Sequence, residues 1–111
     1  MTPVSDPAAA DLARRLGFLL AELRQERELT QEQVARAAGI SRNHLQLLES
    51  GLSNRSGAPA NPRLSTLIVL AQVLGTDVPT MVRSVFSAVD SHVPERLEPT
   101  IAAWSRELFS Q

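Results

Sequence analysis

Arginine is the residue type whose number and placement in this chain suggest a chemical role. A guanidinium group binds phosphate and carboxylate oxygens through several N–H donors. The 111 residues carry eleven basic side chains, all of them arginine, against twelve acidic ones. Residues 14–63 hold eight of these arginines and five glutamates, whereas residues 1–13 and 64–111 are each acidic on balance. A basic middle between acidic flanks indicates a segment that faces a polyanion.

The sequence gives little support for metal binding, a phosphate-binding loop or catalysis. There is no cysteine, which excludes disulfides and thiolate metal sites. The two histidines, His44 and His92, lie far apart in the sequence, and neither has a cluster of metal-ligating residues beside it. A Gly-rich phosphate-binding loop is also missing. We therefore expect no catalytic residue, no metal, no cofactor and no enzymatic activity.

The length and hydropathy of the chain are those of one soluble domain. No apolar run is long enough to span a bilayer, so no membrane association is expected. The first residues, MTPVSDPAAAD, lack the basic and then apolar order of a signal peptide. The expected location is the cytoplasm.

The elements that position the arginines are helices, because apolar residues recur at three- and four-residue steps and alternating strand patterns are missing. Thr30 with Gln33 forms a capping-box pattern that starts a helix, and Gly39, Gly51 and Gly75 stop helices. Asn61 is expected to cap a helix whose first residue is Pro62. The fold class is therefore all-α, with helices over about 8–28, 30–38, 41–50, 62–74, 77–86 and a last one from 94 or 99 to 109.

Residues 34–48 match a helix-turn-helix, in which two short helices are joined by a turn containing glycine. The motif needs a small residue where the helices cross, which Ala35 supplies, and a glycine in the turn, which Gly39 supplies. The inward apolar positions are filled by Val34, Ala38, Ile40, Leu45 and Leu48. Seven positions in register make a specific signal.

The stretch LRQERELTQEQVARAAGISRNHLQLLESG, residues 23–51, resembles the helix-turn-helix core of lambda-repressor/Cro-like (XRE-type) transcription regulators. The stretch NPRLSTLIVLAQVLGTDVPTMV, residues 61–82, resembles the fourth and fifth helices of the same five-helix domain. The resemblance implies a five-helix lambda-repressor-like DNA-binding domain over residues 10–86. A flexible N-terminus, residues 1–9, precedes it, and a linker with an additional C-terminal helix, residues 87–111, follows it.

The resemblance also implies that helix 41–50 lies in the major groove of double-stranded DNA. Arg42 could then donate twice to guanine, and Asn43 or Gln46 could bond adenine through two hydrogen bonds. Leu47 departs from the polar residue often found there, so it either packs on a thymine methyl or reads little. The implied base-contacting residues are Ser41, Arg42, Asn43, Gln46 and Leu47.

In the family, phosphates are held at the start of helix 30–38 and after Gly51. About eight extra residues, near SNRSGAPA, enlarge the 52–60 loop, which either contacts phosphate or is a tolerated insertion with a solvated arginine. His44 either contacts phosphate or covers the helix edge. The implied phosphate-contacting residues are Thr30, Gln31, His44, Asn54, Arg55 and Arg63. Arg24 and Glu49 occupy the positions of a structural ion pair, and Arg24 could also reach a phosphate.

The C-terminal helix carries an apolar stripe of Leu97, Ile101, Trp104 and Leu108. This stripe either packs on its own domain or builds a homodimer, and we favour dimerisation through residues 80–111 because one such domain contacts only a half-site. The sequence thus predicts a sequence-specific DNA-binding regulator, most simply a dimeric repressor of a palindromic operator. The alternative is an antitoxin, which binds a toxin partner and its own promoter.

Overall fold

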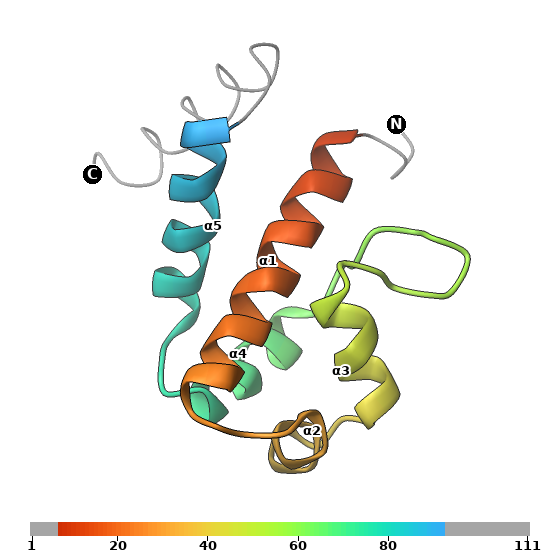
Figure 1. Ribbon diagram of the computed structural model, residues 1–111, viewed down its shortest axis with the longest axis vertical. Coiled ribbons are helices and arrows are strands. Elements are labelled where there is room, and N and C mark those ends of the chain that lie inside the picture. The colour runs from red at the N-terminus through yellow and green to blue at the C-terminus, as the bar shows by residue number, and fades with distance from the viewer. Residues whose placement is uncertain (1–6, 93–111) are drawn as a thin grey trace.

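The computed structural model describes residues 7–92, which form five helices and no strand (Figure 1). This architecture confirms the all-α prediction. The five helices are α1 (Pro7–Glu26), α2 (Gln31–Ala38), α3 (Arg42–Glu49), α4 (Leu64–Val73) and α5 (Val78–His92). An isolated antiparallel bridge joins Leu52 to Pro59 in the loop between α3 and α4.

The core lies between α1 and the other helices. α1 packs against α3 and α5, α2 packs against α3 and α4, and α4 also contacts α5. Figure 1 shows α1 and α5 side by side, with α2 across the lower end of the molecule. The apolar stripes predicted from the sequence meet in one buried cluster of Leu20, Val34, Ala35, Leu45, Leu48, Leu70, Ala71, Leu74 and Met81.

Gly17 allows α1 to approach α3 more closely than any other residue type would. A Cβ at this position would lie 2.5 Å from the carbonyl oxygen of Leu48 and 2.6 Å from that of Glu49. Both neighbours are backbone atoms at the end of α3, so they cannot swing away as a side chain does. The absence of a Cβ therefore sets the distance between α1 and the helix-turn-helix.

α1 ends earlier than the predicted helix 8–28. Its last residue is Glu26, and Glu28 adopts a left-handed conformation with φ of 56°. The N–H of Leu29 returns to the carbonyl oxygen of Arg24 at 3.1 Å, which closes the helix end. This turn directs the chain into the capping box of α2 without a glycine.

Three other predicted boundaries are wrong. Residues 7–9 belong to α1 rather than to a flexible N-terminus, and residues 87–92 continue α5 rather than forming a linker. Arg63, with φ of −67° and ψ of 152°, is the N-cap of α4, so the predicted cap at Asn61 is not used. The N–H of Ala60 is hydrogen-bonded to Gly51 O at 2.9 Å, which keeps this segment paired with the end of α3. The chain is therefore still leaving the loop at these positions.

Large apolar side chains remain exposed on two helices. Phe18 of α1 is 70% exposed, and Leu64 and Ile68 of α4 are 64% and 42% exposed. Between residues 7 and 92, no single helix has the length and hydropathy needed to cross a membrane. α4 together with Val78–Ser87 passes that test only as a pair, and the two are bent by 96°.

Candidate nucleic-acid interface

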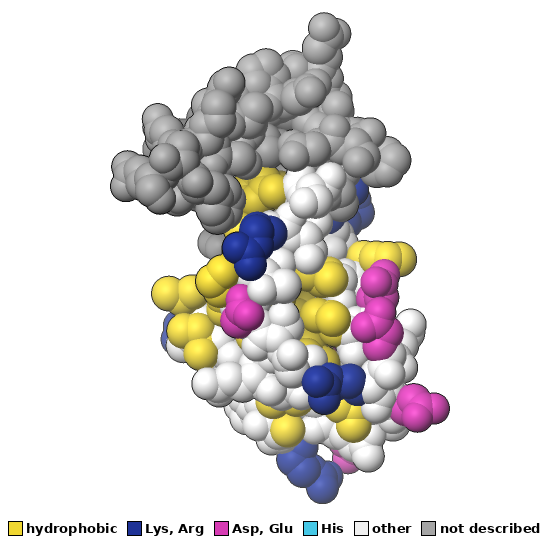
Figure 2. Space-filling view, turned by 90° about the vertical axis from the view of Figure 1, so that its left-hand side faces the viewer, with side chains coloured by type: hydrophobic (Ala, Val, Ile, Leu, Met, Phe, Trp, Pro, Cys, Tyr) yellow, Lys and Arg dark blue, Asp and Glu magenta, His cyan; other side chains and the backbone are white. Residues whose placement is uncertain are grey.

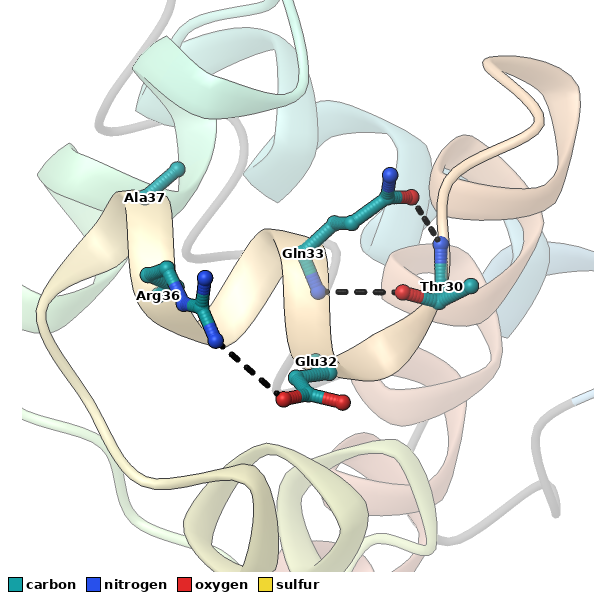
Figure 3. A pocket seen from close by; sticks show the side chains of 5 residues that line it. All are labelled: Thr30, Glu32, Gln33, Arg36 and Ala37. Carbon is teal, nitrogen blue, oxygen red and sulfur yellow. Dashed lines mark hydrogen bonds and ion pairs between the residues drawn. The ribbon is translucent and has the colours of Figure 1, made fainter.

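The N-terminus of α2 is held by a complete capping box (Figure 3). The N–H of Gln33 donates to Thr30 Oγ1 at 3.0 Å, and the N–H of Thr30 donates to Gln33 Oε1 at 2.9 Å. Glu32 and Arg36 pair at 3.3 Å along the outer face of the same helix. These residues line a pocket of about 440 Å³, and Figure 3 shows that their polar groups already bond to one another.

The turn between α2 and α3 follows the predicted pattern. Gly39 has φ of 73°, a left-handed conformation that glycine adopts without strain. The N–H of Ile40 donates to Ala35 O at 3.0 Å, and the N–H of His44 donates to Ser41 Oγ at 3.0 Å. Ser41 is therefore the N-cap of α3, which fixes where the exposed helix begins.

α3 separates its inward and outward residues as a DNA-reading helix requires. Leu45 and Leu48 are 1% and 3% exposed and hold the helix on the core. The predicted base-contacting residues Ser41, Arg42, Asn43 and Gln46 are all exposed, as is His44. Leu47 is half-buried instead of pointing fully outward, and its carbonyl oxygen accepts the N–H of Leu52 at 2.8 Å. Four of the five predicted residues are therefore exposed, and one of them, Ser41, uses its hydroxyl oxygen to cap α3.

Arg24 and Glu49 form the predicted pair. Arg24 Nε donates to Glu49 Oε2 at 2.7 Å and its Nη2 donates to Glu49 Oε1 at 3.1 Å. The two side chains are only 14% and 7% exposed, and Arg24 Nη1 also donates to Leu29 O at 2.9 Å. This two-point ion pair ties α1 to the end of α3, and it neutralises the acid beside the outward face.

Gln31 joins this ion pair, which the sequence did not predict. Its Nε2 donates to Glu49 Oε1 at 3.0 Å, so the amide is fixed at the start of α2. Thr30, the other phosphate candidate on this helix, has its hydroxyl oxygen in the capping box. The two side chains therefore position the α2 N-terminus, whose first N–H groups have no partner within the helix.

The 52–60 loop is a folded hairpin that projects from the end of α3 (Figure 1). Two hydrogen bonds flank the bridge between Leu52 and Pro59. The N–H of Ser53 donates to Ala58 O at 2.9 Å, and the N–H of Ala60 donates to Gly51 O at 2.9 Å. At the tip, Asn54 Oδ1 accepts the N–H of Ser56 at 2.9 Å. The oxygen of Asn54 is thus used within the loop, while Arg55 stands exposed at the tip.

The described arginines differ in their partners. Arg14, Arg15, Arg24 and Arg36 form ion pairs with carboxylates. Five exposed arginines form no ion pair with any residue between 7 and 92, namely Arg27, Arg42, Arg55, Arg63 and Arg83. Arg27 donates to Leu74 O and Arg83 donates to Thr80 Oγ1. The other three lie on α3, at the loop tip and at the start of α4, where the sequence predicted DNA contacts.

Comparison with known proteins agrees with this geometry. Residues 15–84 match the family model of a helix-turn-helix domain. An uncharacterized HTH-type transcriptional regulator, y4dJ of Sinorhizobium fredii, is 40% identical over 65 residues, which make up 59% of this chain and 75% of that protein. No solved structure matches the chain. The matched residues include α2, α3 and the loop that follows them, and the chain belongs to the helix-turn-helix family of DNA-binding transcription regulators, of the lambda-repressor/Cro-like (XRE) type.

Proposed function

We propose that this protein is a sequence-specific repressor that binds a palindromic operator as a dimer, with α3 in the major groove. The observation that carries the proposal is the open face of α3. It presents Arg42, Asn43 and Gln46 to solvent, while Leu45 and Leu48 anchor the opposite face. An arginine that reads guanine and an amide that reads adenine give such a face direct sequence readout.

The phosphate contacts surround this helix. Arg55 and Arg63 lie on the segment that follows α3 and form no ion pair within residues 7–92, and residues 50–63 contain no acid. The N–H groups at the start of α2 supply donors on the other side of α3. Contacts of this kind set the register and the affinity but carry no sequence information. His44 and the NH₂ group of Asn54 complete the proposed set of phosphate donors.

The proposal is tested by selecting bound duplexes from a random DNA pool with the full chain. A palindromic consensus is expected, because a twofold dimer reads two identical half-sites. Arg42→Ala with Asn43→Ala should then lose at least about tenfold in affinity for the selected site, since each lost bidentate contact is equivalent to about 1–3 kcal/mol. Normal binding by this double variant would exclude α3 as the reader.

A matched variant separates phosphate contact from base reading. Arg55→Ala should weaken binding to the selected site and to unrelated DNA by similar factors. It should also reduce the slope of log affinity against log salt by about one unit, because one fewer counterion is released. Arg83→Ala is the matched control, since Arg83 is also an exposed arginine but lies on α5, outside the proposed DNA contacts. An unchanged slope in Arg55→Ala would leave the loop without a DNA contact.

Dimerisation is part of the same proposal. The stripe of Leu97, Ile101, Trp104 and Leu108 lies outside the described residues, and residues 93–96 separate it from α5 in the chain. Sedimentation of the full chain across a range of concentrations tests for the dimer. A chain that remains monomeric both alone and on a selected palindrome would refute dimerisation.

A further inference from the structure

An apolar groove runs between α1 and α5, and residues 60–62 of the segment before α4 also line it. Its volume is about 430 Å³, and its floor includes Ala13 and Met81, which are 5% and 2% exposed. Leu12 and Leu16 line it from α1, and Val82, Val85 and Phe86 line it from α5. Figure 2 views the side on which α5 lies and shows hydrophobic side chains in a band along that face. The described residues leave this groove without a helix across it.

We propose that the groove receives the C-terminal stripe of a second copy of this chain, in a reciprocal exchange. The inference rests on the proposed function only in requiring a dimer. It adds the receiving surface, which the stripe alone does not identify. Each copy would give Leu97, Ile101, Trp104 and Leu108 to the partner's groove and would accept the same four residues in its own.

The dimensions of the stripe and the groove agree. A helix over residues 97–108, as the sequence predicts, would extend about 16 Å, and the α5 side of the groove, from Val78 to Phe86, extends about 12 Å. A stripe of this length covers the groove from end to end. The apolar character of the four side chains matches that of the lining residues, so no buried charge has to be neutralised.

The buried area favours exchange over a one-sided contact. A buried tryptophan removes about 150–250 Å² from water, so the stripe with its three aliphatic residues removes roughly 500 Å². With the groove surface it covers, one stripe gives roughly 1,000 Å², which is near the lower limit for a specific interface. Two reciprocal contacts give about twice that area, which is the size of a stable dimer interface.

The sequence between α5 and the stripe favours the second copy over the chain's own groove. The groove runs back along α5, so a stripe docking on its own domain requires the chain to reverse directly after His92. Only residues 93–96 separate the end of α5 from Leu97. A short connection that has to reverse favours exchange of the element beyond it between copies.

Disulfide trapping tests the proposal, because the chain has no cysteine of its own. Full chains carrying Val82→Cys are mixed with size-tagged full chains carrying Ile101→Cys and are oxidised. The expected product is a disulfide between tagged and untagged chains. Ala102→Cys, one residue further and on another side of a helix, is the matched control and should give several-fold less product.

The alternatives overturn the proposal. If Val82→Cys with Ile101→Cys on one chain gives only an internally linked monomer, the stripe occupies its own groove. If neither arrangement links, the groove is not the receptor.

Val85→Arg should also abolish the dimer in sedimentation, while Ser84→Arg, on the exposed face of α5, should not. Circular dichroism checks that both variants fold, and the trapping result stands whether or not any DNA is selected.

Discussion

The ion pair between Arg24 and Glu49 gives the most direct test of how the helix-turn-helix is held on α1. Glu49→Ala removes an acid that accepts three hydrogen bonds, two from Arg24 and one from Gln31. Removing one partner of a buried ion pair destabilises a protein by about 3–5 kcal/mol, mainly because the other charge stays buried alone. Here Arg24 keeps its bond to Leu29 O and is 14% exposed, so it is partly solvated. We expect a loss of about 2–3 kcal/mol in the free energy of unfolding.

Urea denaturation followed by circular dichroism measures this loss, and for a domain of this size it corresponds to a fall of about 8–12 °C in Tm. Glu32→Ala is the matched control, because Glu32 also pairs with an arginine but is 68% exposed. Exposed pairs contribute no more than about 1 kcal/mol, so the control should be close to the parent protein. A Glu49→Ala variant within about 0.5 kcal/mol of Glu32→Ala would refute the reasoning.

A double variant separates the buried charge from the lost hydrogen bonds. Arg24→Met with Glu49→Leu removes both charges and keeps apolar volume at the junction of α1 and α3. It should be more stable than Glu49→Ala, since no unpaired guanidinium remains and apolar replacements of buried pairs are often neutral. If the double variant is the less stable of the two, the hydrogen bonds outweigh the uncompensated charge.

Three further predictions concern the helix ends and one close contact. Gly17→Ala should lower stability by about 1–2 kcal/mol in urea denaturation, because a Cβ 2.5 Å from Leu48 O forces α1 away from α3. Glu28→Gly should raise it by up to about 1 kcal/mol, since glycine relieves the left-handed backbone at φ of 56°. The N–H of Thr80 donates to Asp77 Oδ1 and, with the Thr80 hydroxyl and Arg83, lowers the pKa of Asp77 below its usual 3.8. This bond therefore stabilises the fold above the unfolded-state pKa and is lost as pH falls through the lower folded pKa. Urea titrations between pH 6 and 3 should show a smaller acid loss in Asp77→Asn.

The parts of the fold that the sequence predicted depend on residues close together in the chain. The capping box of Thr30 and Gln33 and the turn at Gly39 each involve a few neighbouring residues, and the structure contains both. The stripes of α1 to α4 follow from helical spacing alone. Such local signals predict the helix-turn-helix because its two helices and turn occupy fewer than twenty residues.

The predictions that failed depend on contacts between distant residues. The start of α4 at Leu64 is set by pairing of Ala60 with Gly51, which no pattern near Asn61 reveals. No pattern near Gly17 predicts its close contact with α3, which lies about thirty residues further along the chain. The bond from Gln31 to Glu49 joins residues eighteen positions apart. A polar residue at the start of α2 gives no sign of which partner it has.

The 52–60 loop has a local signal, its polar composition, and a fold that this signal does not reveal. The fold changes how much Arg55 can contribute to DNA binding. Its composition indicates only a polar insertion, but the bonds from Ser53 to Ala58 and from Ser56 to Asn54 order it before any ligand binds. A disordered loop would lose about 1–2 kcal/mol of backbone entropy for each residue fixed on DNA. The hairpin has already lost most of that freedom on folding, so a phosphate contact by Arg55 would have to order little more than its own side chain. Asn54→Ala should therefore weaken DNA binding by releasing the loop, even though its amide oxygen faces the backbone rather than a phosphate.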